Sequence, residues 1–301
     1  MKSSKSIVGP LVLGLAFIAV STAAVAPALK FTFKDVNAPG AVETDTYANN
    51  NAGVITGDYL DSGGNIHGMI LKGKKLTTID DPKGNTTQGY GINNKGAVAG
   101  WYVSSTTGNP QAFVYAKGKF TDIKIKNMIY DEASGINDNG DIVGFYLDSA
   151  GAQHGFVKVG TKVTKLDPPG TTATTGWGIN NAGLVTLFII DSTGSYASFT
   201  TKNKGKTYKK FADPMAGSVG TAVHTPNNKG DIVGTYFDTN SIAQGTLLHG
   251  GKYYEFHDPK APQGGPGTRG DGLNDTLMIT GRYGAGPSGG NGGYGFRAQA
   301  K

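Results

Sequence analysis

Short apolar runs of strand length, separated by polar turns, fill this chain after residue 30. The runs repeat with a period of about 44 residues, which is typical of propellers and solenoids. Each copy is marked by a turn rich in Asn and Gly, residues that tolerate positive φ and favour β-hairpins. The six turns are Asn50-Asn51-Ala52-Gly53, Asn93-Asn94-Lys95-Gly96, Asn137-Asp138-Asn139-Gly140, Asn180-Asn181-Ala182-Gly183, Asn227-Asn228-Lys229-Gly230 and Asn274-Asp275-Thr276-Leu277.

Each of the first five copies contains four predicted strands. A strand ending in small-x-Tyr follows the turn in five copies, at Gly57-Asp58-Tyr59, Gly100-Trp101-Tyr102, Gly144-Phe145-Tyr146, Gly234-Thr235-Tyr236 and Gly281-Arg282-Tyr283, whereas the fourth copy has Leu187-Phe188-Ile189. A polar loop, a short apolar strand, a Lys/Gly turn and a last strand follow. Turns at intervals of about 8 to 12 residues indicate an all-β protein. Four strands per radially repeated unit are the pattern of a propeller blade.

The sixth copy lacks a fourth strand, and the N-terminus supplies a candidate for it. Residues 31–40 resemble the last strand and exit loop of the third copy, residues 164–170. Pairing this strand with the last copy would remove sheet edges that invite aggregation. We therefore predict an all-β, six-bladed β-propeller of four-stranded blades, closed by an N-terminal strand that pairs with the C-terminal blade. The predicted domain is 29–301, with blades near 42–87, 88–130, 131–173, 174–218, 219–263 and 264–301 plus 29–41.

This framework resembles the HAF-repeat family of bacterial extracellular proteins, which is named for a His-Ala-Phe triplet in the third strand. The corresponding triplets here are His67-Gly68-Met69, Gln111-Ala112-Phe113, His154-Gly155-Phe156, Ala197-Ser198-Phe199, Gln244-Gly245-Thr246 and Tyr294-Gly295-Phe296, none of them a literal match. The resemblance rests on the Gly-Ile-Asn-x-x-Gly, Gly-x-Tyr and Asp-Pro framework after residue 30. It implies a secreted β-propeller scaffold and no particular reaction.

The first 28 residues have the pattern of a signal peptide. Lys2 and Lys5 precede an apolar run at 7–20, and small residues at 24–28 permit cleavage after Ala28. A membrane anchor is the alternative, but the run is shorter than the ~20 residues that a spanning helix needs. We expect an exported protein, extracellular or periplasmic, with no membrane span after cleavage.

The composition excludes several classes of chemistry. The chain has no cysteine, so thiol catalysis and cysteine-ligated zinc are excluded. It has no phosphate loop, dinucleotide fingerprint, nucleophile elbow or histidine spacing typical of a metal site. We expect no cofactor, no bound metal and no catalytic residues. Calcium at oxygen-rich loops such as 58–65 stays an open alternative, although no twelve-residue calcium loop is present.

Charge suggests one candidate surface. The net charge is +6 and falls to +4 when the two lysines of residues 1–28 are removed. Lysines cluster at the turns between third and fourth strands, which share one face of a propeller. This basic face includes Lys74, Lys75, Lys117, Lys119, Lys204 and Lys206. Its field would attract polyanions, whereas the alternative is that these lysines provide solubility and discourage edge pairing. No motif indicates specific nucleic-acid binding.

The inner strands suggest a second surface, at the mouth of the central channel. Two positions per copy, two residues apart on the first strand and therefore on one side of it, differ from copy to copy. They place Asp45, Tyr47, Tyr90, Glu132, Trp177, His224, Arg269 and Asp271 around the mouth. Aromatic faces can stack on sugars, and the charged groups can bind hydroxyls.

Two functions are consistent with these residues. The first is a secreted module, acting as a monomer, that binds a carbohydrate or a cell-surface or extracellular protein at the channel mouth. The alternative is a polysaccharide hydrolase or lyase that uses the acidic residues. Asp45 and Glu132 would be the acid/base pair, which requires a carboxyl separation of ~5 to 9.5 Å.

Overall fold

The computed structural model describes residues 29–191, 193–262, 265–284 and 293–301, so the predicted signal peptide lies outside the described residues. The described chain consists of strands and turns, which confirms the all-β class. No described segment forms a helix with the length and apolar character needed to cross a membrane.

Four sheets contain four strands each, hydrogen-bonded in chain order. They are β6 (Gly84–Ile92), β7 (Val98–Ser104), β8 (Pro110–Ala116) and β9 (Lys119–Asp122); β10 (Met128–Ile136), β11 (Ile142–Asp148), β12 (Gln153–Val159) and β13 (Lys162–Leu166); β14 (Thr174–Ile179), β15 (Val185–Ile190), β16 (Tyr196–Thr201) and β17 (Lys209–Phe211); β18 (Thr221–Pro226), β19 (Ile232–Phe237), β20 (Ala243–His249) and β21 (Lys252–Phe256). The first strands β6 and β10 begin a few residues before the predicted boundaries at 88 and 131.

The remaining eight strands form one sheet. It contains β2 (Glu43–Asn49), β3 (Ile55–Leu60), β4 (Ile66–Lys72), β5 (Lys75–Ile79), β22 (Thr268–Leu273), β23 (Met278–Tyr283), β24 (Tyr294–Ala300) and β1 (Phe31–Asp35). Its two halves meet at a single parallel pair, Thr44 and Tyr294. β1 pairs antiparallel with β24 from Phe31↔Ala300 to Asp35↔Phe296. The N-terminal strand therefore lies where the sixth copy of the repeat lacks one.

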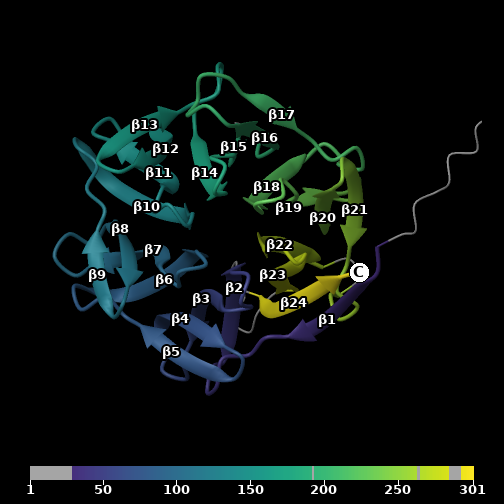
Figure 1. Ribbon diagram of the computed structural model, residues 1–301, viewed down its shortest axis with the longest axis horizontal. Coiled ribbons are helices and arrows are strands. Elements are labelled where there is room, and N and C mark those ends of the chain that lie inside the picture. The colour runs from purple at the N-terminus through teal and green to yellow at the C-terminus, as the bar shows by residue number, and fades with distance from the viewer. Residues whose placement is uncertain (1–28, 192, 263–264, 285–292) are drawn as a thin grey trace, which may run out of the picture.

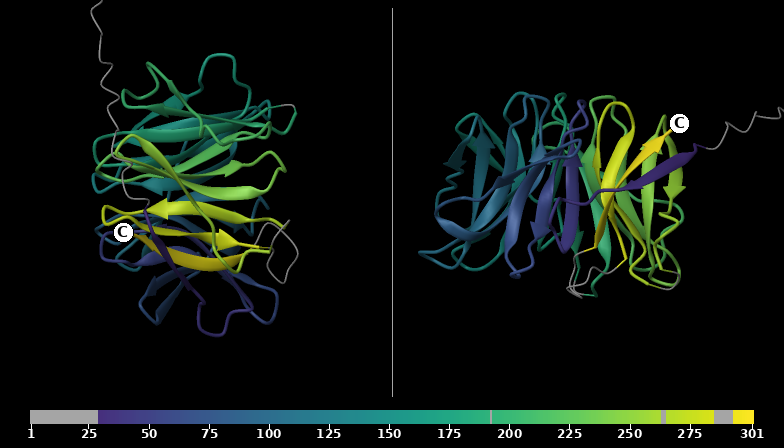
Figure 2. Two further views of the ribbon diagram at one scale, coloured as in Figure 1. Left: turned by 90° about the vertical axis from the view of Figure 1, so that its right-hand side faces the viewer. Right: turned by 90° about the horizontal axis from the view of Figure 1, so that it is seen from below.

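The sheets stand side by side around a central axis, with the first strand of each group innermost (Figure 1). Seen from the side, the strands run roughly along this axis and the turns gather at its two ends (Figure 2). Because the strands of each group are antiparallel neighbours, the first and third turns of a group lie at the same end. We call this the Asn-turn end.

Close backbone contacts explain the recurrent glycines of the Gly-x-Tyr strands. A Cβ built on Gly100 would lie 2.0 Å from the carbonyl oxygen of Gln88 on the neighbouring strand. The apolar core lies between sheets at the third strands, where Met69, Phe113 and Phe156 are fully buried.

The Asn turns cap themselves. In the first turn the Asn50 Oδ1 accepts hydrogen bonds from the backbone N–H groups of Ala52 and Val54, each at 3.1 Å. Gly53 has φ of 72°, as the hairpin prediction requires. In the sixth turn Leu277 takes the left-handed conformation instead, with φ of 59°.

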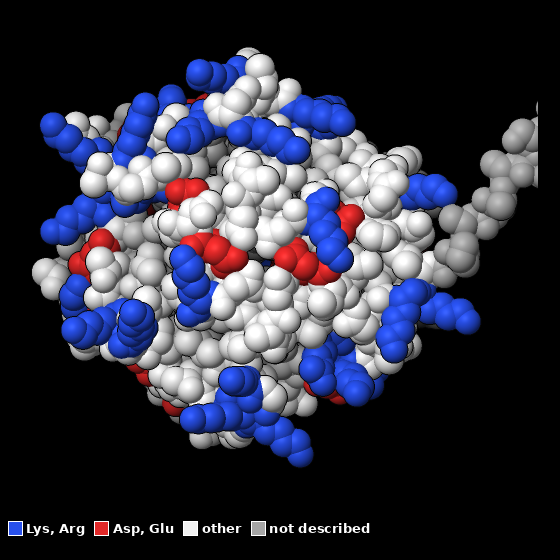
Figure 3. Space-filling model, in the orientation of Figure 1, with Lys and Arg blue, Asp and Glu red and all other residues white. Residues whose placement is uncertain are grey.

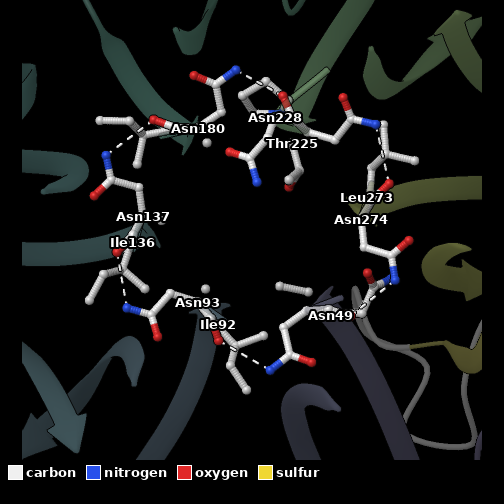
Figure 4. Close-up of a pocket in the computed structure, with 18 of the residues that line it drawn as sticks. Asn49, Ile92, Asn93, Ile136, Asn137, Asn180, Thr225, Asn228, Leu273 and Asn274 are labelled. Carbon is white, nitrogen blue, oxygen red and sulfur yellow. Dashed lines mark hydrogen bonds between the residues drawn. The ribbon is translucent and has the colours of Figure 1, made fainter. Parts of the chain in front are cut away.

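The same asparagines bind the six turns to one another. The first Asn of each turn donates its Nδ2 hydrogen bond to the backbone carbonyl of the first Asn in the next turn, and Figure 4 shows side chains of this ring. The bonds are Asn50→Asn93 (3.1 Å), Asn93→Asn137 (3.0 Å), Asn137→Asn180 (3.1 Å), Asn180→Asn227 (2.8 Å), Asn227→Asn274 (3.2 Å) and Asn274→Asn50 (3.0 Å). This Asn ring joins the last turn of the chain to the first.

We expect Asn93→Asp to lower the free energy of unfolding by about 1–3 kcal/mol. The new carboxylate keeps the oxygen that caps Lys95 and Ala97 but loses the donor to Asn137 and sets an oxygen against its carbonyl. Urea denaturation measures the change. Asn240→Asp, at an exposed turn outside the ring, is the control, and equal unfolding midpoints for the two variants would contradict a stabilising role of the ring.

Candidate functional site

A β-bulge in every first strand directs one variable residue toward the axis. In β2 the pairing with β3 passes from Thr46 to Ala48, so Tyr47 is the extra residue. The other first strands have the same register shift around the equivalent residues. A bulge re-aims the side chain that it carries. These residues are Tyr47, Tyr90, Ser134, Trp177, His224 and Asp271.

The bulge residues form a row of touching rings. Tyr47 stacks on Tyr90 with ring centroids 4.3 Å apart, and Tyr90 meets Trp177 edge to face at 5.7 Å. Trp177 stacks on His224 at 4.6 Å. His224 Nδ1 lies 3.1 Å from Asp271 Oδ1 and 2.6 Å from the Gly270 carbonyl oxygen. Side chains from five separate copies of the repeat are therefore in one contact network.

An arginine that is absent from the sequence-based prediction completes this network, with its side chain 13% exposed. The Arg282 guanidinium lies 3.6 Å from Asp45 Oδ2 and 3.9 Å from Asp271 Oδ2. It also donates a 3.1 Å hydrogen bond to the Tyr47 hydroxyl. These contacts raise the pKa of Arg282 despite burial, so it stays charged.

The carboxyl groups of the network differ in their environment. Burial raises the pKa of Asp45 to about 6, although Arg282 and the Gly293 N–H oppose the shift. Burial also raises the pKa of Asp58, and the neighbouring Asp45 adds to the effect. For Asp271, burial is outweighed by Arg282 and His224, which together lower its pKa. Arg282 and His224 therefore favour the ionised form of Asp271, whereas burial outweighs the effect of Arg282 on Asp45 and Asp58.

Glu132 and Arg269 lie at the edge of this network. Both are half-buried. The Tyr130 hydroxyl donates a hydrogen bond to Glu132, and burial raises the pKa of Glu132 to about 7. Burial lowers the pKa of Arg269, and the adjacent Arg282 charge lowers it further. Asp45 and Glu132 have separate partners, Arg282 for Asp45 and Tyr130 for Glu132.

The sequence-based prediction missed a third set of axial residues, the variable x of the Gly-x-Tyr motif. Each one pairs directly with a predicted mouth position on the first strand, as Asp58 does with Asp45 and Trp101 with Gln88. The full set is Asp58, Trp101, Phe145, Thr235 and Arg282, together with Phe188 at the equivalent position of the fourth copy, where Leu187-Phe188-Ile189 replaces the motif. Their variation within a constant motif is the signal that would have identified them.

The structure also changes the expected exposure of the mouth. Asp45, Tyr47, His224 and Asp271 are all less than 9% exposed, whereas Tyr90, Glu132, Trp177 and Arg269 are half-buried. The aromatic row fills the axis, because the bulges turn side chains inward onto one another. Only the half-buried members are open to a ligand in this conformation.

A pocket opens on the axis at the Asn-turn end, and we call it the axial pocket. Asn side chains surround its opening, and aliphatic side chains such as Ile92, Ile136 and Leu273 line it below them (Figure 4). Tyr90, Ser134 and Trp177 line its inner end.

The six predicted basic-face lysines are exposed and belong to turns at the Asn-turn end. Within the described residues, none of them pairs with a carboxylate; the paired lysines are Lys83, Lys165 and Lys260. Figure 3 shows Lys and Arg side chains around the rim of one face and Asp and Glu side chains nearer its middle.

His67 and His154 occupy equivalent positions in separate sheets. Each bridges two aspartates, Asp61 and Asp80 for His67 and Asp148 and Asp167 for His154. Across the described ranges, no three His, Asp or Glu side chains are arranged to hold a metal ion.

No protein-family model matches the chain, and no curated protein matches it in sequence. Several solved structures are similar in fold. They include a putative TolB from Agrobacterium tumefaciens (TM-score 0.54, 12% identity, covering 76% of this chain and 88% of that one), a Hadza microbial sialidase (0.53, 12%, 86% and 66%) and a variant of Aleuria aurantia lectin in complex with Fucα1-6GlcNAc (0.51, 11%, 89% and 94%). At these identities the similarity concerns the fold alone, which is propeller-like.

We expect Glu132→Gln to stabilise the protein at pH 8 by about 1–3 kcal/mol and to change little at pH 4. The folded pKa of about 7 exceeds the unfolded value of 4.5, so the folded state loses stability as the pH rises through this interval. Glutamine stays neutral and avoids that loss. Urea denaturation at both pH values measures the difference.

Glu255→Gln, at an exposed position, is the matched control. Its difference in stability from the parent protein should be the same at both pH values. A Glu132→Gln variant that is no more stable than the parent protein at pH 8 would contradict a buried, destabilising carboxylate.

Proposed function

We propose that this protein is an exported six-bladed β-propeller of the HAF-repeat type that acts as a binding module. The closed cycle of six Asn hydrogen bonds and the β1–β24 pair support the blade count and the closure. The repeat framework supports the family. The signal-peptide pattern of residues 1–28 supports export, and the uninterrupted repeat supports one domain over 29–301.

The observation that carries a binding role is a cluster of half-buried aromatic rings around Glu132. Tyr90 contacts Trp101 at 6.4 Å, and Tyr130 contacts Phe145 at 5.7 Å. The indole N–H of Trp101 has no hydrogen-bond partner in the structure. Partly exposed rings beside a carboxylate are suited to stacking on a sugar ring and binding its hydroxyls. We call these residues the aromatic cluster.

A saccharide is therefore the ligand that we favour, and a protein surface is the other outcome of the test. The Aleuria aurantia lectin is a protein of similar fold that was crystallised with a saccharide. TolB structures have the same general fold. These likenesses are compatible with a binding role, and the aromatic cluster is the argument for it.

One observation favours the alternative of a polysaccharide hydrolase or lyase. The raised pKa of Glu132 would keep its carboxyl partly protonated at neutral pH, as a general acid requires. The predicted partner carboxylates, Asp45 and Asp271, are both already paired with Arg282. Binding without turnover is therefore the better supported function.

We expect the purified protein to be retained on at least one member of a polysaccharide panel without releasing soluble product. Trp101→Ala should reduce retention about tenfold, because sugar stacking on the indole is lost, whereas Trp101→Phe should retain most of it. Affinity electrophoresis and reducing-end analysis measure retention and product.

Soluble product that disappears in Glu132→Ala or Asp271→Ala would establish the enzyme instead. Absence of both retention and product across the panel would exclude a saccharide role and leave a protein partner as the binding function.

The basic face is a second proposed contact, for polyanions. Its six lysines lack carboxylate partners, so their charge is available to a ligand. Lys117 and Lys204 hold the left-handed conformation, with φ of 51° and 57°, which is unfavourable for a residue with a side chain. Glycine takes the equivalent place in other turns, at Gly73 and Gly160. A lysine at these two positions therefore costs conformational free energy that a glycine would not.

We expect the protein to bind heparin, and we expect the affinity to fall steeply as the salt concentration rises from about 50 to about 200 mM, because the binding of a polyanion is electrostatic. Lys117→Gln with Lys119→Gln should weaken it, whereas Lys124→Gln with Lys126→Gln, which removes the same charge beyond the other end of β9, should not. Heparin chromatography at graded salt measures both, and salt-independent or equal elution would contradict the proposal.

A further inference from the structure

The axial pocket has a strongly one-sided charge. The described residues that line it include two carboxylates, Asp138 and Asp275, and no lysine, arginine or histidine. These aspartates stand on the third and sixth turns, so they face each other across the sixfold arrangement of the Asn ring. Lys95 and Lys229 lie near them but outside the lining.

Both aspartates are held in their ionised form. Asp138 accepts hydrogen bonds from the Asn94 N–H (2.7 Å), the Asn94 Nδ2 (2.9 Å) and the Asn181 Nδ2 (2.7 Å). Asp275 accepts the equivalent three bonds from Asn228 and Asn51, at 2.6 to 3.0 Å. Against the effect of burial, these amide bonds lower the pKa of each carboxyl.

Inside this charged opening the pocket becomes apolar and then aromatic. Ile92, Ile136, Ile179 and Leu273 form an aliphatic collar, and Tyr90 and Trp177 lie at the inner end. A cation lying against an aromatic ring is attracted by its π-electrons. The aliphatic collar gives no ligand to a hydrated metal ion, but it suits alkyl groups.

Acidic side chains also lie behind the aromatic rings, but burial raises the pKa of both Asp58 and Glu132 and so favours their neutral forms. Arg282 is on the far side of Tyr47, where Asp45 and Asp271 hold it. The negative charge that a positive ligand meets is therefore that of Asp138 and Asp275 at the opening, followed by the π-electrons of Tyr90 and Trp177.

The size of the pocket restricts the ligand further. Its cavity volume is about 70 Å³, which has room for a few water molecules or one compact group and not for a sugar ring. The saccharide that we propose for the aromatic cluster cannot be the occupant here.

We propose that the axial pocket binds a small organic cation, a methylammonium or dimethylammonium group, against Trp177 and Tyr90. The ionised pair Asp138 and Asp275 attracts the cation to the opening. The aliphatic collar displaces its hydration water, and the cation then lies against the aromatic rings. Tyr90 also belongs to the aromatic cluster, whereas Trp177, Asp138 and Asp275 do not, so variants at these three residues test the axial pocket separately from the saccharide-binding role.

The test is isothermal titration of the purified protein with methylammonium chloride, against methanol as a neutral molecule of similar size and sodium chloride at equal ionic strength. We expect methylammonium to bind at least tenfold more tightly than methanol. Trp177→Leu should raise its dissociation constant roughly tenfold, and Trp177→Phe, which keeps an aromatic ring, about threefold or less.

Because Trp177 also packs on His224, a second variant keeps the test decisive if Trp177→Leu does not fold. Asp138→Asn with Asp275→Asn removes the charge at the exposed opening and should weaken methylammonium binding while leaving methanol unaffected. Equal affinities for methylammonium and methanol, heat no larger than that of sodium chloride, or unchanged binding by folded variants would overturn the proposal. None of these outcomes bears on polysaccharide retention, which is measured separately.

Discussion

The Asn ring is the interaction on which the rest of the molecule depends. Each asparagine caps its own turn through Oδ1 and reaches the next turn through Nδ2, so none of its hydrogen-bonding groups is left unpaired. The bond from Asn274 to Asn50 completes the cycle, so every turn both donates to and accepts from a neighbour. If the neighbouring turn were missing, the buried Nδ2 group of an asparagine would lose its hydrogen bond, and no water molecule would replace the lost partner. The ring therefore favours a complete circle of turns over any partial one.

A fixed ring of turns has a consequence for the strands that enter it. The bulge lies three residues before the ring asparagine in each copy, as Tyr90 does before Asn93, so all six bulge residues meet at one level of the axis. Burying Asp45 and Asp58 there costs free energy that one arginine only partly offsets. Residues that lower the stability of a fold are typical of functional positions. The axis is for this reason a better candidate site than the apolar core between the sheets.

Period and turn chemistry were sufficient to predict the turns, the strands per copy and the pairing of residues 31–35 with the last strand. They also identified most axial residues, because those vary where the scaffold repeats. The sequence did not identify Arg282 and Asp58 as axial residues, because they lie inside the most regular motif. Only the strand pairing shows that they lie opposite the first strand. The sequence did not predict the β-bulges either. Without them, residues two apart on a strand seem to line an open mouth, whereas Tyr47 and His224 are buried against other rings.

The charges of the molecule separate possible ligands by sign. Unpaired lysines occupy the rim of the Asn-turn end, whereas Asp138 and Asp275 occupy its centre and further carboxylates lie deeper on the axis. A polyanion attracted by the rim is repelled from the centre, so it would follow the rim and leave the axial pocket free. A small cation experiences the reverse, because the low-dielectric walls of the pocket strengthen the attraction of its carboxylates. The aromatic row of Tyr47, Tyr90 and Trp177 forms the inner end of this pocket, and Tyr90 is the residue that the row shares with the cluster around Glu132. One ring of hydrogen-bonded turns thus positions three surfaces that differ in charge and shape, and each is suited to a different class of ligand.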